Sequence, residues 1–186
     1  MSVEDFILYS GGANGAEQAF GSNAERKGIE EVNFTFDGHK IARQRGLRML
    51  NHEEMKSGDF SLEYVSNLMH RRYTDGLAMR KVLQSIWHQI NSGQQIFVIG
   101  EILDDNTVKG GTGWGAEFAK ICNKRLYVFD QTKDAWYQWN RTEWVESGSD
   151  EQPAITQIHF TGTGTRFLAE NGEQAIKDLF DRSFPG

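Results

Sequence analysis

Hydrophobic residues fall into short runs along the first part of the chain, separated by glycine and polar segments. The run Phe6-Ile7-Leu8-Tyr9 is followed by glycines and is typical of a strand buried on both faces of a parallel sheet. Over residues 16–27, apolar residues recur on one side, which predicts a helix that stops at Gly28. Strict alternation over 32–36 predicts a second strand. The chain therefore begins as a β-α-β unit.

The middle of the chain is predicted to be mostly helical from Gly38 to Ser92. Breaks are expected near 56–59 and near 74–76, and the segment 77–90 carries an apolar stripe at helical spacing. A basic stretch from Lys40 to Arg48, together with Arg71, Arg72, Arg80 and Lys81, is interpreted as a solvated helix face, with a phosphate-facing patch as the alternative.

Strands and helices alternate again in the second half. The expected elements are a central strand over 95–99, a helix over 115–122, a parallel strand over 126–129, an antiparallel edge strand over 135–139, a strand over 155–160 and a closing helix over 166–181. Together they predict an α/β fold, a Rossmann-like doubly wound, mainly parallel sheet with an antiparallel edge hairpin. We expect a single domain over residues 1–186, with the helical segment 38–92 within it.

Composition narrows the class of protein. At 186 residues with 38% apolar content, the chain is long enough to bury one sizeable core. The net charge of −6 disfavours a nucleic-acid backbone as the main partner. The one cysteine, Cys122, excludes an internal disulfide and is expected to be a small packed residue. The sequence has neither a long apolar run nor a signal-like N-terminus, which predicts a cytoplasmic protein with no membrane partner.

Glycine-rich turns follow three of the predicted strands. They are Ser10-Gly11-Gly12-Ala13-Asn14-Gly15-Ala16-Glu17, Gly110-Gly111-Thr112-Gly113-Trp114-Gly115-Ala116-Glu117 and Gly162-Thr163-Gly164-Thr165. A tight turn between a strand and a helix presents backbone N–H groups and a positive helix end to an anion. The carboxyl ends of parallel strands meet at one edge of a sheet, so we expect a small nucleotide or phosphoribosyl ligand to bind where the turns gather.

The candidate ligand-binding residues come from the first two turns. They are Ser10, Gly11, Gly12, Asn14, Gly110, Gly111, Thr112, Gly113 and Trp114. Ser10 is interpreted as a hydroxyl contact, because it lacks the surroundings of a nucleophile. Trp114 is expected at the mouth of the cleft, where its ring can stack on a base. From spacing alone, an ordinary turn with a capping glutamate explains Glu117 equally well. The five histidines are too dispersed for metal-ligand spacing, so no metal is predicted.

The second turn resembles the Pro-Gly-Gly-x-Gly-Thr-x-x-Glu signature of the LOG family, the cytokinin-activating nucleoside 5′-monophosphate phosphoribohydrolases. The first turn resembles that of the wider SLOG superfamily, which includes DNA-processing protein A. This chain departs from the signature at three places: Lys109 replaces the proline, Gly113-Trp114 replaces the Gly-Thr pair, and residues 102–108 are inserted between strand and turn.

The resemblance implies a nucleotide-binding protein that hydrolyses an N-glycosidic bond. Glu117 matches the family's catalytic glutamate, and Arg80, in Met79-Arg80-Lys81, matches its catalytic arginine. The resemblance implies no cofactor, and it implies a homodimer. Two alternatives stay open: a non-catalytic sensor or sponge for a nucleotide signal, in defence or regulation, and a nucleic-acid binder like the DNA-processing relative, which the net charge disfavours.

Overall fold

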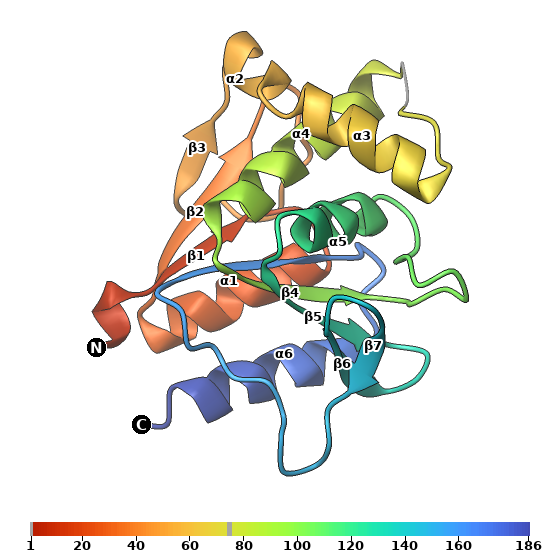
Figure 1. Ribbon diagram of the computed structural model, residues 1–186. Coiled ribbons are helices and arrows are strands. Elements are labelled where there is room, and N and C mark those ends of the chain that lie inside the picture. Colours follow the sequence, from red (N-terminus) through yellow and green to blue (C-terminus); the bar gives the residue numbers. More distant parts are fainter. Residues whose placement is uncertain (1, 74–75) are drawn as a thin grey trace.

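The computed structural model describes residues 2–73 and 76–186, and it contains one eight-stranded sheet (Figure 1). Across the sheet the strand order is β3-β2-β1-β8-β4-β5-β6-β7. Strands β3 to β5 in this order are parallel, whereas β6 and β7 are antiparallel at one edge. The predicted α/β fold with a mainly parallel sheet and an antiparallel edge hairpin is confirmed.

The strands are β1 (Ile7–Ser10), β2 (Glu30–Thr35), β3 (Leu47–Met49), β4 (Gln95–Gly100), β5 (Arg125–Asp130), β6 (Ala135–Trp139), β7 (Trp144–Glu146) and β8 (His159–Gly164). The helices are α1 (Ala16–Lys27), α2 (His52–Lys56), α3 (Asp59–Met69), α4 (Leu77–Ser92), α5 (Thr112–Ile121) and α6 (Glu170–Ser183), with a short 3-10 helix at Val3–Asp5.

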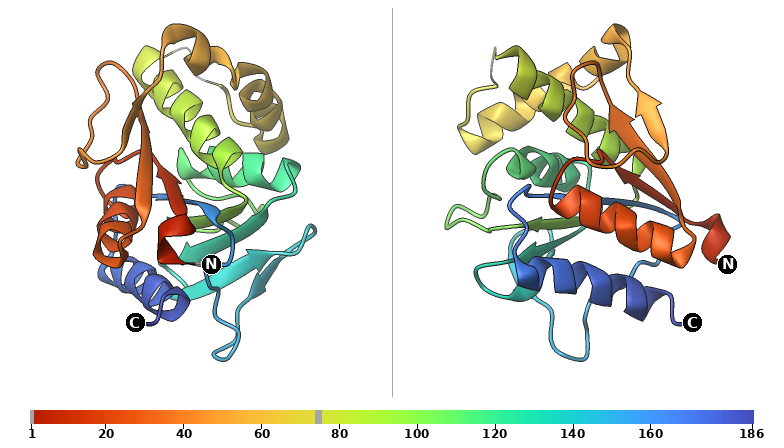
Figure 2. Two further views of the ribbon diagram at one scale, coloured as in Figure 1. Left: turned by 90° about the vertical axis from the view of Figure 1, so that its left-hand side faces the viewer. Right: turned by 180° about the vertical axis from the view of Figure 1, so that it is seen from behind.

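Helices cover both faces of the sheet, as in a doubly wound fold (Figures 1 and 2). Helices α1 and α6 lie side by side on one face, and α4 and α5 lie on the other. Helix α3 forms an outer layer, since it packs on α4 and α5. The long connection that leads from β3 to β4 therefore adds helices above the sheet.

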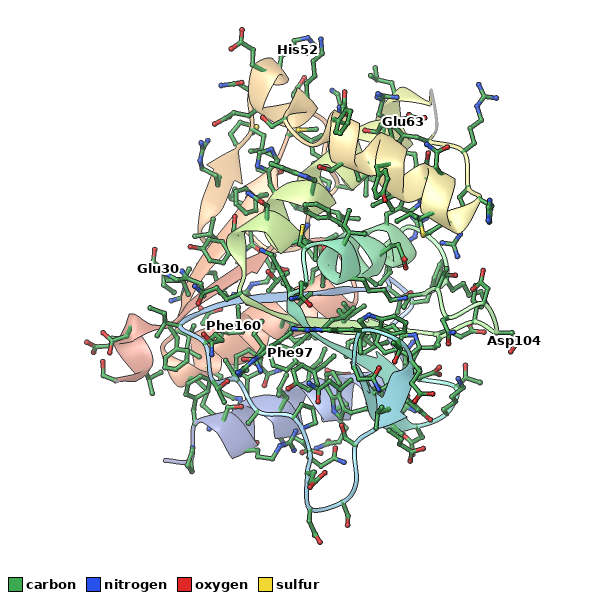
Figure 3. The ribbon with its side chains drawn as sticks, in the orientation of Figure 1. Glu30, His52, Glu63, Phe97, Asp104 and Phe160 are labelled. Carbon is green, nitrogen blue, oxygen red and sulfur yellow. The ribbon has the colours of Figure 1, made fainter. Side chains whose placement is uncertain are left out.

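The core is divided by the sheet into two layers. On the α1 and α6 side, Phe97 and Phe160 are fully buried at the centre, where their rings pack edge-to-face (Figure 3). On the α4 and α5 side, aliphatic residues of β4 and β5 pack against these helices. All six residues of β4 are buried, which explains the unbroken apolar run that predicted it.

Several predicted boundaries agree closely with the structure. Helix α1 spans the predicted residues, and Gly28 ends it in the left-handed conformation. Strand β6 occupies the predicted range and pairs antiparallel with β5. The prediction of a break near 74–76 falls largely outside the described residues.

Other predictions were wrong. Strand β8 begins four residues later than expected, so most of the third glycine segment lies inside a strand rather than in a turn. Strand β3 interrupts the segment that was predicted to be helical. The Lys40 to Arg48 stretch forms a loop and part of β3, and no helix face. Cys122 is exposed at the end of α5.

Within the described ranges, no helix combines the length and apolar character needed to cross a bilayer.

Candidate functional site

The carboxyl ends of the parallel strands form the edge where a ligand site is expected. In Figure 3, Asp104 in the loop after β4 marks this edge, and Glu30 at the start of β2 marks the opposite one. Backbone hydrogen bonds join neighbouring strand ends: Thr165 N–H donates to Ile99 O at 2.9 Å, and Gln131 N–H donates to Gly100 O at 3.0 Å. The ends of β8, β4 and β5 therefore form one continuous rim.

The first and third glycine segments touch at this rim. Gly15 has a φ of 89°, and a Cβ there would lie 2.5 Å from the Cα of Arg166. The N–H of Ala16 donates to the carbonyl of Thr165 at 3.0 Å. Glycine is required at position 15 both by its positive φ and by this close approach. Two of the three segments that were predicted to gather at this edge, the first and the third, are therefore in contact.

Ser10 has a structural role in this turn. Its side chain is 1% exposed, and its hydroxyl donates to the carbonyl of Gly162 at 2.6 Å. This hydrogen bond ties β1 to β8 and leaves no exposed hydroxyl for a ligand. Gly11 and Gly12 are also buried, whereas Asn14 is exposed.

A buried carboxyl group, that of Glu17, lies beneath the first turn. Its Oε2 accepts the N–H of Ala13 at 3.0 Å, and its Oε1 accepts the hydroxyl of Thr163 at 2.9 Å. Burial raises the pKa of Glu17, against the opposing effect of these hydrogen bonds and of one with Gln89. The carboxyl group therefore occupies the position at the α1 N-terminus where an external anion would bind.

Two buried amide oxygens flank the same glycines. The Oε1 atom of Gln89 and the Oδ1 atom of Asn33 have no hydrogen-bond partner among the described residues. A Cβ on Gly11 would lie 2.5 Å from Gln89 Nε2, and a Cβ on Gly12 would lie 3.4 Å from Asn33 Oδ1. The first turn is consequently lined by hydrogen-bond acceptors, and it resembles an anion-binding nest less than the sequence predicted.

An ion-pair network fastens the loop 36–46 over the first turn. Arg43 binds the fully buried Glu31 through two hydrogen bonds, of 2.6 and 2.8 Å, and binds Glu25 at 2.8 Å. The backbone N–H groups of Ala42 and Arg43 donate to the carbonyl of Gly12. Arg43 thus has its charge neutralised inside the protein and is unsuited to a phosphate-facing role.

The second turn lies beside Arg71, which the sequence analysis assigned to the basic patch and not to the candidate site. The guanidinium of Arg71 donates to the carbonyls of Val108 and Gly110, at 3.1 and 3.2 Å, and to the Thr107 hydroxyl at 2.8 Å. A Cβ on Gly113 would overlap the Val108 carbonyl oxygen. Arg71 and Gly113 therefore hold the inserted segment against the start of α5. The adjacent pair Arg71-Arg72 marks a local concentration of positive charge in the sequence. The sequence does not indicate, however, that Arg71 binds the second turn, 37 or more positions away.

A hollow of about 470 Å³ opens next to Arg71. It is lined by Glu63, Ser66, Asn67, His70, Arg71, Arg72 and Tyr73. The backbone N–H groups of Gly111 and Thr112 make no hydrogen bond to another described residue. The start of α5 thus has N–H donors in the turn that Arg71 binds, and Arg71 itself borders the hollow.

Trp114 and Arg80 contribute to the packing of α3, α4 and α5. Trp114 is only 6% exposed, and its ring packs 5.6 Å from that of Tyr73. Arg80 stacks 4.0 Å above the Tyr73 ring and lies 3.4 Å from Asp59. Burial is the largest influence on Asp59 and opposes ionisation, but hydrogen bonds from Gln84, Tyr73 and Arg80 together lower its pKa. Little of the Trp114 ring is left for a base to contact.

Glu117 lies in a different set of contacts from Arg80. Its carboxylate is 3.1 Å from the ammonium of Lys120, which stacks 4.0 Å above the ring of Trp139. The Lys120 ammonium also donates to the carbonyl of Asn106 at 2.7 Å. Burial lowers the pKa of Lys120, and the ion pair with Glu117 opposes that effect. Each member of the predicted catalytic pair therefore has its own charged partner, Asp59 for Arg80 and Lys120 for Glu117.

No group of three or more histidine, cysteine, aspartate or glutamate side chains suited to a metal occurs in the described part of the chain.

Comparison of the chain with protein-family models, with curated protein sequences and with solved structures finds no match. The resemblance to the SLOG superfamily therefore stays a hypothesis, and the candidate site is defined by its own geometry.

Proposed function

We propose that this chain binds a small nucleotide or phosphoribosyl ligand at the carboxyl-end edge of its sheet, with the phosphate at the start of α5. The observation that supports this best is Arg71, which brings a fixed guanidinium to the second glycine turn, next to the 470 Å³ hollow. Gly111 and Thr112, in the same turn, add N–H groups that make no hydrogen bond to another described residue. Arginine and helix N-termini are both common phosphate-binding groups.

The proposed phosphate position is at the second turn and not at the first, which the sequence analysis also included. The N–H groups of Ala13, Ala16 and Gln18 already donate to protein acceptors there, and the Glu17 carboxyl group occupies the turn. A phosphate would meet acceptors instead of donors. Gly11 and Gly12 then serve the packing of strand ends, whereas the exposed Asn14 stays available to a ligand.

Binding without cleavage is the version of the proposal that the geometry favours. A carboxylate that stabilises a developing oxocarbenium ion must reach the glycosidic bond. The Glu117 side chain is 16% exposed and paired with Lys120, and Arg80 is engaged with Asp59 and Tyr73. The hydrolase of the LOG type is the second candidate, which follows from the glutamate's place in the Gly-Gly-Thr-Gly-x-x-x-Glu segment.

The test is to incubate the purified protein with nucleoside monophosphates, dinucleotides and cyclic nucleotides, and to measure both the melting temperature and the released base. We expect stabilisation by at least one of these compounds without release of base. Arg71→Lys keeps the charge but loses the two-pronged geometry, and it should weaken binding at least tenfold. The control Lys177→Ala removes an exposed cation from α6 and should bind like the wild type.

Base release that disappears in Glu117→Ala would favour the hydrolase instead. The absence of both stabilisation and release across the set of compounds would overturn the proposal.

We further propose that a homodimer forms through α3. Phe60, Tyr64 and Leu68 are 89%, 54% and 44% exposed, and they follow one another at four-residue intervals on one helix face. Contiguous exposed apolar surface of this kind is typical of interfaces. Light scattering should give a dimer for the wild type and a monomer for Tyr64→Glu, with Phe167→Ser unchanged as the control. A monomeric wild type would contradict the proposed homodimer.

A further inference from the structure

A second concave surface lies where the end of α5 meets the β6–β7 hairpin, and its lining is chemically distinctive. The hollow has a volume of about 240 Å³. Its lining residues are Lys120, Asn123, Lys124, Arg125, Gln138, Trp139, Asn140 and Arg141. Four of these are cations, three are amides and one is tryptophan, and no carboxylate borders the hollow. On a chain with a net charge of −6, this is a local concentration of positive charge.

The four cations are not equivalent. Lys124 donates to the carbonyls of Ile90, Asn91 and Gly93 and so ends helix α4, and Lys120 is paired with Glu117. The side chains of Arg125 and Arg141 make no hydrogen bond, ion pair or ring contact with any other residue that the structure describes. Their guanidinium groups are the donors left for a ligand.

The backbone holds one of these arginines in a costly conformation. Arg141 has a φ of 89°, a backbone conformation that residues other than glycine rarely adopt. The Asn140 side chain fixes the turn by accepting the N–H groups of Thr142 and Glu143 at 3.0 and 2.9 Å. The turn thus fixes the backbone of Arg141 on the rim of the hollow and leaves its side chain available to a ligand.

Trp139 provides a fixed aromatic surface at the same place. Its ring lies 5.1 Å from that of Trp144 in an edge-to-face arrangement, and the Lys120 ammonium is 4.0 Å from its centre. The Trp144 indole N–H and the Lys120 ammonium both donate to the Asn106 carbonyl, at 3.0 and 2.7 Å. These contacts hold the Trp139 ring against the hollow and limit its rotation.

We propose that this hollow binds a phosphate-bearing ligand, with the phosphate on Arg125 and Arg141 and an attached planar ring against Trp139. Arginine binds phosphate through paired donors, and aromatic side chains stack on bases without regard to their identity. The volume admits one phosphate and one ring rather than a long ligand. Because Arg125 begins β5, the site lies at the amino-end edge of the sheet, opposite the glycine turns, and it does not depend on the function proposed for that edge.

The test uses calorimetric titration with three probes: pyrophosphate, adenosine 5′-monophosphate and a 5′-phosphorylated thymidine hexanucleotide. The proteins are the wild type, the double variant Arg125→Ala/Arg141→Ala, the charge control Lys177→Ala, and Arg71→Ala, which disables the proposed site at the second turn. Thermal melts establish that each variant is folded. Both arginines are at the surface, so the double variant should fold.

We expect at least one probe to bind the wild type and Arg71→Ala equally and to bind the double variant at least tenfold more weakly, with Lys177→Ala unchanged. Binding of the monophosphate would identify a free nucleotide as the source of the phosphate, and binding of the hexanucleotide alone would identify a nucleic-acid end. The proposal is overturned if no probe binds, or if the double variant binds as the wild type does.

Discussion

At the scale of single residues, Glu17 is a buried carboxyl group whose surroundings raise its pKa. It is 7% exposed and lies beneath a turn that was expected to receive a phosphate. An ionised carboxylate is costly there, because burial removes its hydration. When protonated, it needs an acceptor, and the unpartnered Oε1 of Gln89 becomes one if the amide rotates by 180°.

This arrangement predicts a pH dependence of stability. Because the pKa of Glu17 is raised in the folded state, its contribution is most favourable below its ordinary value of 4.5 and is lost as the pH rises through the folded value. Glu17→Gln is neutral at all pH values, and the Gln89 amide oxygen accepts from it. The variant should therefore gain stability relative to the wild type as the pH increases above 4.5.

Thermal unfolding of both proteins from pH 4.5 to 8 would measure this difference. The comparison of the two proteins cancels the titration of the other carboxyl groups, several of which have lowered pKa values. A difference in melting temperature that stays constant across the range would show that Glu17 does not titrate there.

At the scale of elements, the start of α5 depends on glycine for a steric reason. Replacing glycine by alanine inside a helix normally stabilises it by about 1 kcal/mol. At Gly113, however, the new Cβ would overlap the Val108 carbonyl oxygen and lie 2.7 Å from Arg71 Nη1. We expect Gly113→Ala to lower the free energy of unfolding by about 1–3 kcal/mol, the usual cost of overpacking.

Gly111 provides the matched control in the same turn. A Cβ there would meet only Leu83 Cδ2, at 4.0 Å, and its φ is −62°. Gly111→Ala should leave stability nearly unchanged in urea unfolding. Equal losses in the two variants would show that the turn itself, and not the contact with Val108 and Arg71, requires glycine.

The elements differ in how well the sequence predicted them. Helix α1 and strand β6 were found because their periodicity is regular and local signals such as Gly28 mark the ends. Strand β8 was misplaced because Gly162 and Gly164 lower strand propensity. Gly162 is in fact required where the Phe20 ring packs on the strand.

Parts of the candidate site depend on contacts between segments that are far apart in the sequence. Local sequence patterns do not predict such contacts. The first two glycine turns were predicted correctly as strand-to-helix connections, whereas most of the third lies inside β8, and the residues that contact the turns were not predicted. Glu17 meets Gln89 and Thr163, and Arg71 meets Val108, across 36 or more positions. Such pairings follow from the strand order, and the position of β8 in that order was not predicted.

At the scale of the whole molecule, β8 joins the two halves of the sheet. It pairs with β1 on one side and with β4 on the other, although it follows all the other strands in sequence. Phe160 of β8 is fully buried, with its ring 6.4 Å from that of Phe97 and 6.0 Å from that of Phe180 (Figure 3). The Phe160 ring therefore packs on both β4 and α6 at the strand that joins the two halves.

Loss of the Phe160 ring should consequently weaken the entire fold. We expect Phe160→Ala to lower the free energy of unfolding by about 3–5 kcal/mol, because the surrounding rings cannot close the cavity. Phe167→Ala removes the same ring from a site that is 78% exposed and should change stability by less than about 0.5 kcal/mol. Urea unfolding followed by circular dichroism measures both changes in stability.

Native-state hydrogen exchange tests whether β8 links the two halves of the sheet. The amides of β1, β8 and β4 should lose protection together in Phe160→Ala, because β8 pairs with both β1 and β4. Loss confined to β8 would show instead that the two halves of the sheet hold together without it.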